Sequence, residues 1–192
     1  MQITMEQYEA LRCSPSPKQL LEFQIETLFA KGLARYEDAD RFQRNPPSGL
    51  FLLIPPRPEE SDLNDLVSLI ELKGKKGRNY LDPRYVQDDI KIPDKPYLML
   101  DVKDGKERLN IDPAVSKIHI FQEGRSPYTI WRGIIHTVLF PEVLESHNMD
   151  LVGSPDMPFL CLYCGEPRLD SYRYVPYEFP GWGAPSCGNI IV

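Results

Sequence analysis

The chain has 192 residues, of which 42% are hydrophobic, and a formal net charge of −6. A chain of this length fits one domain and can bury a core without disulfides. Its acidic balance argues against general binding to nucleic acid or anionic membranes, because both would repel it. The first residues are not a signal peptide, and the longest apolar run, residues 50–54, is too short to cross a bilayer. We therefore expect a soluble cytoplasmic protein whose cysteines are free thiols or ligands.

Two helices and one buried strand are predicted in the first part of the chain. Ser16 and Pro17 suit the N-cap and first position of a helix that Gly32 would end. The apolar run 50–54, closed by two prolines, indicates a strand. Apolar residues at helical spacing predict a second helix over residues 62–74.

The rest of the chain mixes strands with one strong helix signal. Residues 74–95 have the pattern of a long irregular connection, and a strand is predicted at 97–102. The spacing of Ile130, Trp131 and the apolar residues after them predicts a helix over 126–139, capped by Ser126. Further strands are predicted at 157–163 and 170–179.

These elements predict an α+β fold, because helices and strands interleave without a βαβ rhythm. We expect a single compact domain over residues 1–192, with a mainly antiparallel sheet and about three main helices. Within it, a helical N-terminal part, 1–73, and a mixed α+β C-terminal part, 96–192, would be joined by the connection 74–95.

One hypothesis is a structural zinc site. Cys161 and Cys164 have the spacing of a zinc knuckle, Gly165 permits the tight turn, and Cys187 would be a third ligand. The second close pair of ligands is missing, however. The alternative is that Cys161 and Cys164 are ordinary residues of a strand, and we favour no metal or other cofactor.

A second hypothesis is a small enzyme. Asp101 interrupts an apolar strand and needs solvent, a partner or a site around it. We expect it to pair with Arg125, near the start of the predicted helix. His136 and Cys187 are candidates for a base and a nucleophile, with His119 as another candidate base. Convergence in a cleft would favour an enzyme, and a Cys187 buried among apolar side chains would oppose it.

Four stretches of the C-terminal half, "PYLMLDVKDG", "EGRSPYTIWRGIIHTVLFPEVL", "LVGSPDMPFLCLYCGEPRL" and "WGAPSCGN", occur in an order that resembles a bacterial family of uncharacterised proteins. The resemblance, to a domain of unknown function, covers about residues 96–192. It implies that the chain shares the fold of that family, but it implies no mechanism. It draws attention to Asp101, Arg125 and Cys187, and it does not require cysteines at the positions of Cys161 and Cys164.

The sequence therefore leaves the function open between three classes. The first is a binding or interaction protein with an unknown protein or small-molecule partner, favoured because no paired catalytic signature occurs. The second is a small hydrolase or transferase with a site around Asp101, Arg125 and Cys187. The third is a structural zinc protein using Cys161, Cys164 and Cys187.

Overall fold

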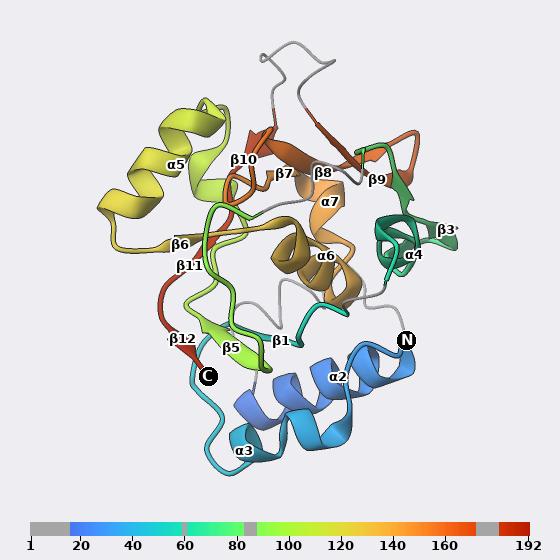
Figure 1. Cartoon of the computed structure of the whole chain (residues 1–192), viewed down its shortest axis with the longest axis vertical. Helices are drawn as coiled ribbons and strands as arrows, with labels where there is room; N and C mark the ends of the chain where they lie inside the picture. Colours follow the sequence, from blue (N-terminus) through green and yellow to red (C-terminus); the bar gives the residue numbers. More distant parts are fainter. Residues whose placement is uncertain (1–15, 59–60, 83–87, 172–180) are drawn as a thin grey trace.

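The computed structural model describes residues 16–58, 61–82, 88–171 and 181–192. Its helices and mainly antiparallel sheets confirm the α+β class (Figure 1). The longer helices are α2 (Pro17–Ala30), α5 (Pro113–Gln122) and α6 (Ile130–Leu139); the shorter ones are α3 (Asp40–Gln43), α4 (Leu63–Ser68), α7 (Val143–Ser146) and the 3-10 turns η1 (Tyr36–Asp38) and η3 (Lys106–Arg108). None of the described helices is long and apolar enough to span a bilayer.

The strands form two main sheets and two small ladders. A three-stranded antiparallel sheet has the order β1 (Phe51–Ile54), β5 (Tyr97–Leu100), β12 (Ile190–Ile191). A five-stranded mixed sheet has the order β10 (Trp182–Gly183), β7 (Asn148–Asp150), β8 (Pro158–Tyr163), β9 (Glu166–Ser171), β4 (Arg78–Asn79). The two-stranded ladders join β11 (Ser186–Cys187) to β6 (Ser126–Pro127) and β2 (Glu71–Leu72) to β3 (Lys75–Lys76).

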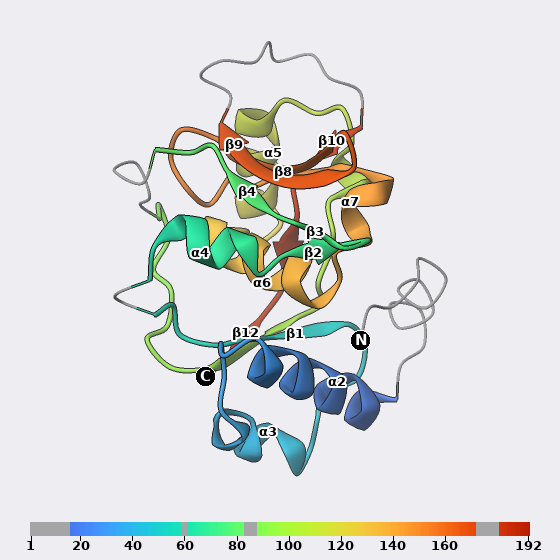
Figure 2. The same cartoon turned by 90° about the vertical axis from the view of Figure 1, so that its right-hand side faces the viewer.

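Helix α6 lies at the centre of the molecule, and all ten of its residues are buried. Figure 2 shows α2 and α3 below the three-stranded sheet, α6 above it, and the five-stranded sheet above α6. The Trp131 indole nitrogen donates to the carbonyl of Pro55, at 2.7 Å, and so joins α6 to the chain just after β1. The core therefore has α6 as its middle layer.

The first helix forms as predicted. Pro17 is its first residue, and Gly32, with a φ of 71°, directly follows the C-cap, where only glycine is free of strain. The Ser16 side chain makes no capping hydrogen bond. Gln24 is fully buried, yet its side chain donates to the carbonyl of Phe51 and accepts from the amide of Leu53. These bonds satisfy backbone groups on the open edge of β1 and fix α2 against that sheet.

Three predicted elements differ from the structure. The second helix ends at Ser68 instead of residue 74, and β2 follows it. The helix predicted from Ser126 begins at Ile130, because Ser126 and Pro127 pair with β11 as a strand. Residues 74–95 were predicted to be irregular, but they contain β3 and β4.

Strand β4 pairs in parallel with β9, and β1 pairs with β5, so pairing crosses all three predicted parts of the chain. The prediction at 170–179 falls on β9 at its start and otherwise lies outside the described residues. The division into parts 1–73, 74–95 and 96–192 stays a prediction.

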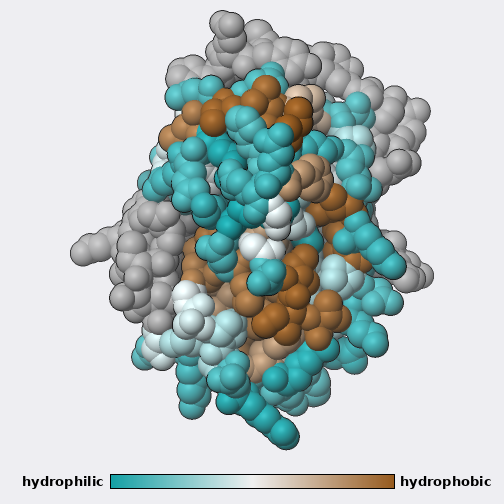
Figure 3. Space-filling view, turned by 90° about the vertical axis from the view of Figure 1, so that its left-hand side faces the viewer, coloured by the Kyte–Doolittle hydropathy of each residue, from teal (hydrophilic) through white to brown (hydrophobic). Residues whose placement is uncertain are grey.

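Helix α5 was not predicted. Asp112 caps it by accepting from the amides of Ala114 and Val115, and Pro113 takes the first position. Only Pro113, Ser116 and Ile120 are buried, whereas Val115, Ile118 and Phe121 are exposed. Figure 3, which views the side where α5 lies, shows brown apolar surface at its level, above a teal polar zone. The usual periodicity signal fails because this helix presents apolar side chains to solvent.

Candidate functional site

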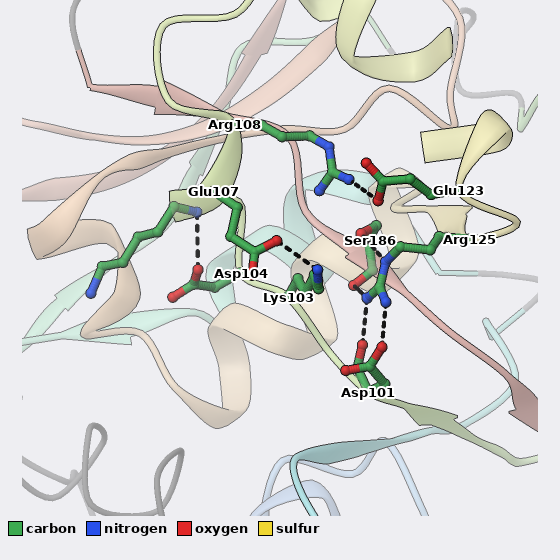
Figure 4. Close-up of polar contacts among 9 residues, drawn as sticks. Asp101, Lys103, Asp104, Glu107, Arg108, Glu123, Arg125 and Ser186 are labelled. Carbon is green, nitrogen blue, oxygen red and sulfur yellow. Dashed lines mark hydrogen bonds and ion pairs between the residues drawn. The ribbon is translucent and has the colours of Figure 1, made fainter. Parts of the chain in front are cut away.

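The predicted pair of Asp101 and Arg125 forms. The Arg125 Nη1 donates to the Asp101 carboxylate, and Nη2 donates to the Asp101 carbonyl at 2.5 Å (Figure 4). Asp101 follows β5 and has a φ of 48°, in the left-handed region that asparagine and aspartate tolerate best after glycine. The Arg125 side chain is only 9% exposed and that of Asp101 is 67% exposed, so the acid is the outer partner.

The same guanidinium also holds the C-terminal segment. Its Nε donates to the Ser186 hydroxyl at 2.9 Å. The backbone of Ser186 bonds on one side to Lys103, at 2.8 and 3.0 Å, and Ser186 pairs with Pro127 of β6 in the ladder. Arg125 therefore ties together three segments that are far apart in sequence, after β5, before β6 and in β11.

A second arginine, Arg132 of α6, lies completely buried beside this ladder. Its Nε donates to the Tyr97 hydroxyl at 3.1 Å, and its Nη1 donates to the Ser126 hydroxyl at 2.7 Å and the Pro127 carbonyl at 2.8 Å. Burial raises the pKa of Tyr97, and the charge of Arg132 opposes that rise. The phenol therefore stays neutral at physiological pH and serves as an acceptor for the guanidinium.

The start of α6 carries two further polar groups. The Ser154 hydroxyl accepts from the amide of Ile130 at 3.0 Å and donates to the Asp88 carboxylate at 2.7 Å. Asp88 is exposed as a whole residue, but its carboxyl group is partly covered where it bonds to Ser154. Burial raises its pKa, whereas the Ser154 bond and the charges of Arg57 and Arg132 lower it. A carboxylate thus lies just beyond the positive end of the α6 dipole.

All four stretches of the family resemblance contribute to this arginine cluster, which we define as Asp101, Arg125, Arg132, Ser154 and Ser186 with their hydrogen-bond partners. Residues from separate parts of the sequence thus meet at one place through side-chain hydrogen bonds.

Cys187 lies in β11, opposite Ser126, and is fully buried in the apolar core. Burial raises the pKa of its thiol, although the charges of Arg132 and Arg125 lower it. A neutral, covered thiol is a poor nucleophile. The arrangement is the one that we expected to oppose an enzyme, and a catalytic role for Cys187 stays a prediction.

The histidines lie apart from Cys187. His136 is buried in α6, where its Nδ1 contacts the Tyr128 hydroxyl at 3.2 Å. Burial lowers the pKa of His136 from 6.5 to about 4, so the ring is neutral at physiological pH. His119 is exposed on α5. Within the described residues, neither ring makes a hydrogen bond to the arginine cluster, and His136 as a base stays a prediction.

The zinc ligands of the third hypothesis lie on different elements. Cys161 is within β8 and Cys164 is exposed at the turn that joins β8 to β9, with a φ of 50°. Cys187 belongs to another ladder. In the ranges that the structure describes, no three His, Cys, Asp or Glu side chains gather as metal ligands. The expected strand interpretation fits Cys161, whereas Cys164 is a turn residue beside Gly165.

Sequence reasoning missed Arg132, Tyr97 and Ser154. One signal was present: Arg132 is a charged residue inside a helix whose other positions are almost all apolar. Such a position predicts a buried charge that needs partners. Tyr97 and Ser154 carry no comparable signal, because their contacts depend on tertiary structure.

The structure thus defines an α+β protein in which a fully buried arginine, Arg132, and a largely covered one, Arg125, lie at the junction of a helix start and a strand ladder. A family model described as a family of unknown function (DUF5701) matches residues 18–157, and the chain belongs to this family. The match includes most of the N-terminal half and ends before Ser186 and Cys187, so its bounds differ from the resemblance at 96–192. No curated protein and no solved structure matches the chain.

The Arg125 network yields a first testable prediction. We expect Arg125→Gln to lower the free energy of unfolding by about 2 kcal/mol, because a covered guanidinium with several hydrogen bonds is lost. In a double-mutant cycle with Asp101→Asn, the coupling should be about 1 kcal/mol or less, because Asp101 is mostly exposed. Urea unfolding measures both values. If Arg125→Gln lowered the free energy of unfolding no more than Asp101→Asn does, the anchoring role of Arg125 would be contradicted.

Proposed function

We propose that this protein is a binding protein that docks a basic, amphipathic segment of a partner protein. The observation that carries the proposal is the apolar stripe of α5. Val115, Ile118 and Phe121 follow one another at intervals of three residues and are 41%, 55% and 49% exposed. Residues at this spacing share one side of a helix. An apolar stripe turned toward solvent is typical of an interaction surface.

The ion pairs beside α5 supply the charge of the surface. In each of three pairs the side chain of the acid is more exposed to solvent than that of its basic partner. The exposed fractions are 67% for Asp101 against 9% for Arg125, and 58% for Glu107 against 30% for Lys103. For the third pair they are 47% for Glu123 against 5% for Arg108. Figure 4 shows Glu123, at the end of α5, and Asp101, at the end of β5, at opposite ends of this set. In these three pairs solvent therefore meets the carboxylates more than the basic groups, and the two arginines are covered.

We name the surface made by this apolar stripe and these three carboxylates the acidic–apolar face. A partner that matches it needs apolar side chains next to Lys or Arg, which is the pattern of a basic amphipathic helix. The Arg108 bond to Glu123 lowers the pKa of that carboxyl, so its charge persists at acidic pH. The same negative charge disfavours anionic membranes and nucleic acid as partners.

A labelled model peptide of Leu and Lys at helical spacing tests the proposal. We expect the full chain to bind it and high salt to weaken the complex. Phe121→Asp should weaken binding about tenfold or more. Phe29→Asp is the matched control, because Phe29 is also 49% exposed and lies on α2. Equal loss in both variants, no binding, or equal binding of a peptide with Glu in place of Lys would contradict the proposal.

We further propose that the protein acts in the cytoplasm, without bound zinc or another cofactor. The free thiols of Cys161, Cys164 and Cys187 support a reducing compartment. The different placement of these cysteines supports a zinc-free protein.

A further inference from the structure

Among the residues that the structure describes, Arg132 is a buried cation whose hydrogen bonds include none to a carboxylate, and Asp88 interacts with it through charge alone. The side chain is fully covered. Its Nη2 is buried and makes no hydrogen bond there, whereas Nε and Nη1 each have partners. Lys and Arg are almost never buried in this way unless they are paired with a negative group.

The hydrogen-bond partners of Arg132 are all neutral. They are the Tyr97 hydroxyl, the Ser126 hydroxyl and the Pro127 carbonyl. Their dipoles stabilise the charge in part, but burial of an unpaired ion costs several kcal/mol. These contacts hold the guanidinium in one orientation and leave Nη2 for another acceptor. A planar guanidinium held in this way matches the oxygens of carboxylate and phosphate groups.

The start of α6 attracts an anion independently of Arg132. The amide of Ile130 and the carboxylate of Asp88 are joined through the Ser154 hydroxyl, at 3.0 and 2.7 Å. The helix has ten residues, and the amides of its first turn carry the positive end of its dipole. A carboxylate of the chain itself therefore already lies at this helix start. The charge of Arg132 also lowers the pKa of Asp88, against the effect of burial.

We infer that Arg132 and the first turn of α6 bind a small oxyanion group, a carboxylate or phosphate, and that Asp88 competes with it. Asp88 is the exposed member of the set, and the entering anion would take the place of its carboxylate beside Ser154. Tyr97, Ser126 and Ser154 position the guanidinium and the helix start. This binding is separate from the acidic–apolar face, because Arg132 is covered and its contacts do not include α5.

Thermal unfolding of the full chain, with sodium phosphate or sodium acetate against sodium chloride of equal ionic strength, tests the inference. A ligand that binds only the folded protein raises the Tm. Asp88→Asn removes the competing charge, so the concentration that gives half the shift should fall about tenfold. Asp89→Asn is the matched control: Asp89 is also exposed, but its carboxylate bonds to Lys117 at 2.5 Å. A response to phosphate alone or to acetate alone identifies the preferred group.

Arg132→Met should abolish the anion-dependent shift, whatever the Tm of the variant itself. If that variant does not fold, the comparison of Asp88→Asn with Asp89→Asn still decides. The inference is overturned if neither the wild type nor Asp88→Asn responds beyond the chloride series, or if both Asn variants respond equally. Binding of the Leu–Lys peptide is measured separately, so failure here leaves the acidic–apolar face untouched.

Discussion

Between pH 6.5 and about pH 4 the protein should lose on the order of 3 kcal/mol of stability through His136 alone, because its pKa falls from 6.5 to about 4 on folding. The ring is fully buried, and desolvation disfavours its charged form. The unfolded chain therefore binds the proton more readily than the folded chain. The contribution of His136 is complete above pH 6.5, falls as the pH drops, and levels off below the folded pKa.

The groups around His136 modify this effect. The charge of Asp104 raises the pKa of the ring, whereas His147 lowers it. Both are themselves buried, and His147 Nε2 contacts the Asp104 carbonyl at 2.8 Å. Elsewhere, burial raises the pKa values of Asp88 and Glu142, and a raised carboxyl pKa gains stability as the pH falls. Glu123, whose pKa the Arg108 bond lowers, acts in the opposite sense and adds to the acid loss. The total profile therefore does not report the His136 contribution by itself.

A variant comparison isolates the histidine. Urea unfolding at several pH values should give a smaller acid loss for His136→Gln than for the wild type, by about 3 kcal/mol at pH 4 relative to neutral pH. Glutamine keeps an amide that can bond the Tyr128 hydroxyl but does not titrate. His119→Gln, on the exposed ring of α5, should follow the wild-type profile. Parallel profiles for the wild type and His136→Gln would refute a neutral buried ring.

Several local elements could be predicted from sequence because their signals are short-range. Pro17 and Gly32 bound α2 by backbone preferences that hold in any context. The apolar runs of β1 and β8 are strands that bury side chains. The Asp101–Arg125 pair followed from one rule, that a charge at the end of an apolar strand needs a partner.

The other features depend on tertiary contacts. Ser126 and Pro127 resemble a helix cap, but pairing with β11, which comes some sixty residues later, makes them a strand. Helix α5 is obscured because its apolar residues do not face the core. The Nη2 of Arg132 is left without a described partner only once Tyr97, Ser126 and Pro127 have been brought together. The sequence identifies a charged residue within an apolar helix, but the groups that surround this residue are known only from the tertiary structure.

The largest steric effect is expected at Gly183, where β10 crosses the turn after β5. A Cβ on Gly183 would lie 2.2 Å from the carbonyl oxygen of Gly105, and a Cβ on Gly105 would lie 2.7 Å from that of Gly183. Both contacts are with backbone carbonyl oxygens, which cannot rotate away as a side chain can. We expect Gly183→Ala to cost about 3 kcal/mol, the upper end of the overpacking range, because the two segments must separate.

Separation of these segments should also weaken the arginine cluster, since Ser186 follows Gly183 by three residues and bonds to both Lys103 and Arg125. Gly188→Ala is the matched control: its nearest contacts are the Asp101 Cβ at 3.3 Å and an Asp101 carboxylate oxygen at 3.4 Å, which a shift of a few tenths of an ångström relieves. We expect it to change the free energy of unfolding by less than about 1 kcal/mol. If Gly183→Ala proved as mild, the close crossing of β10 over Gly105 would not be what holds Ser186 against Arg125. The anchoring would then rest on the β6–β11 ladder and the hydrogen bonds of Ser186 to Lys103 and Arg125.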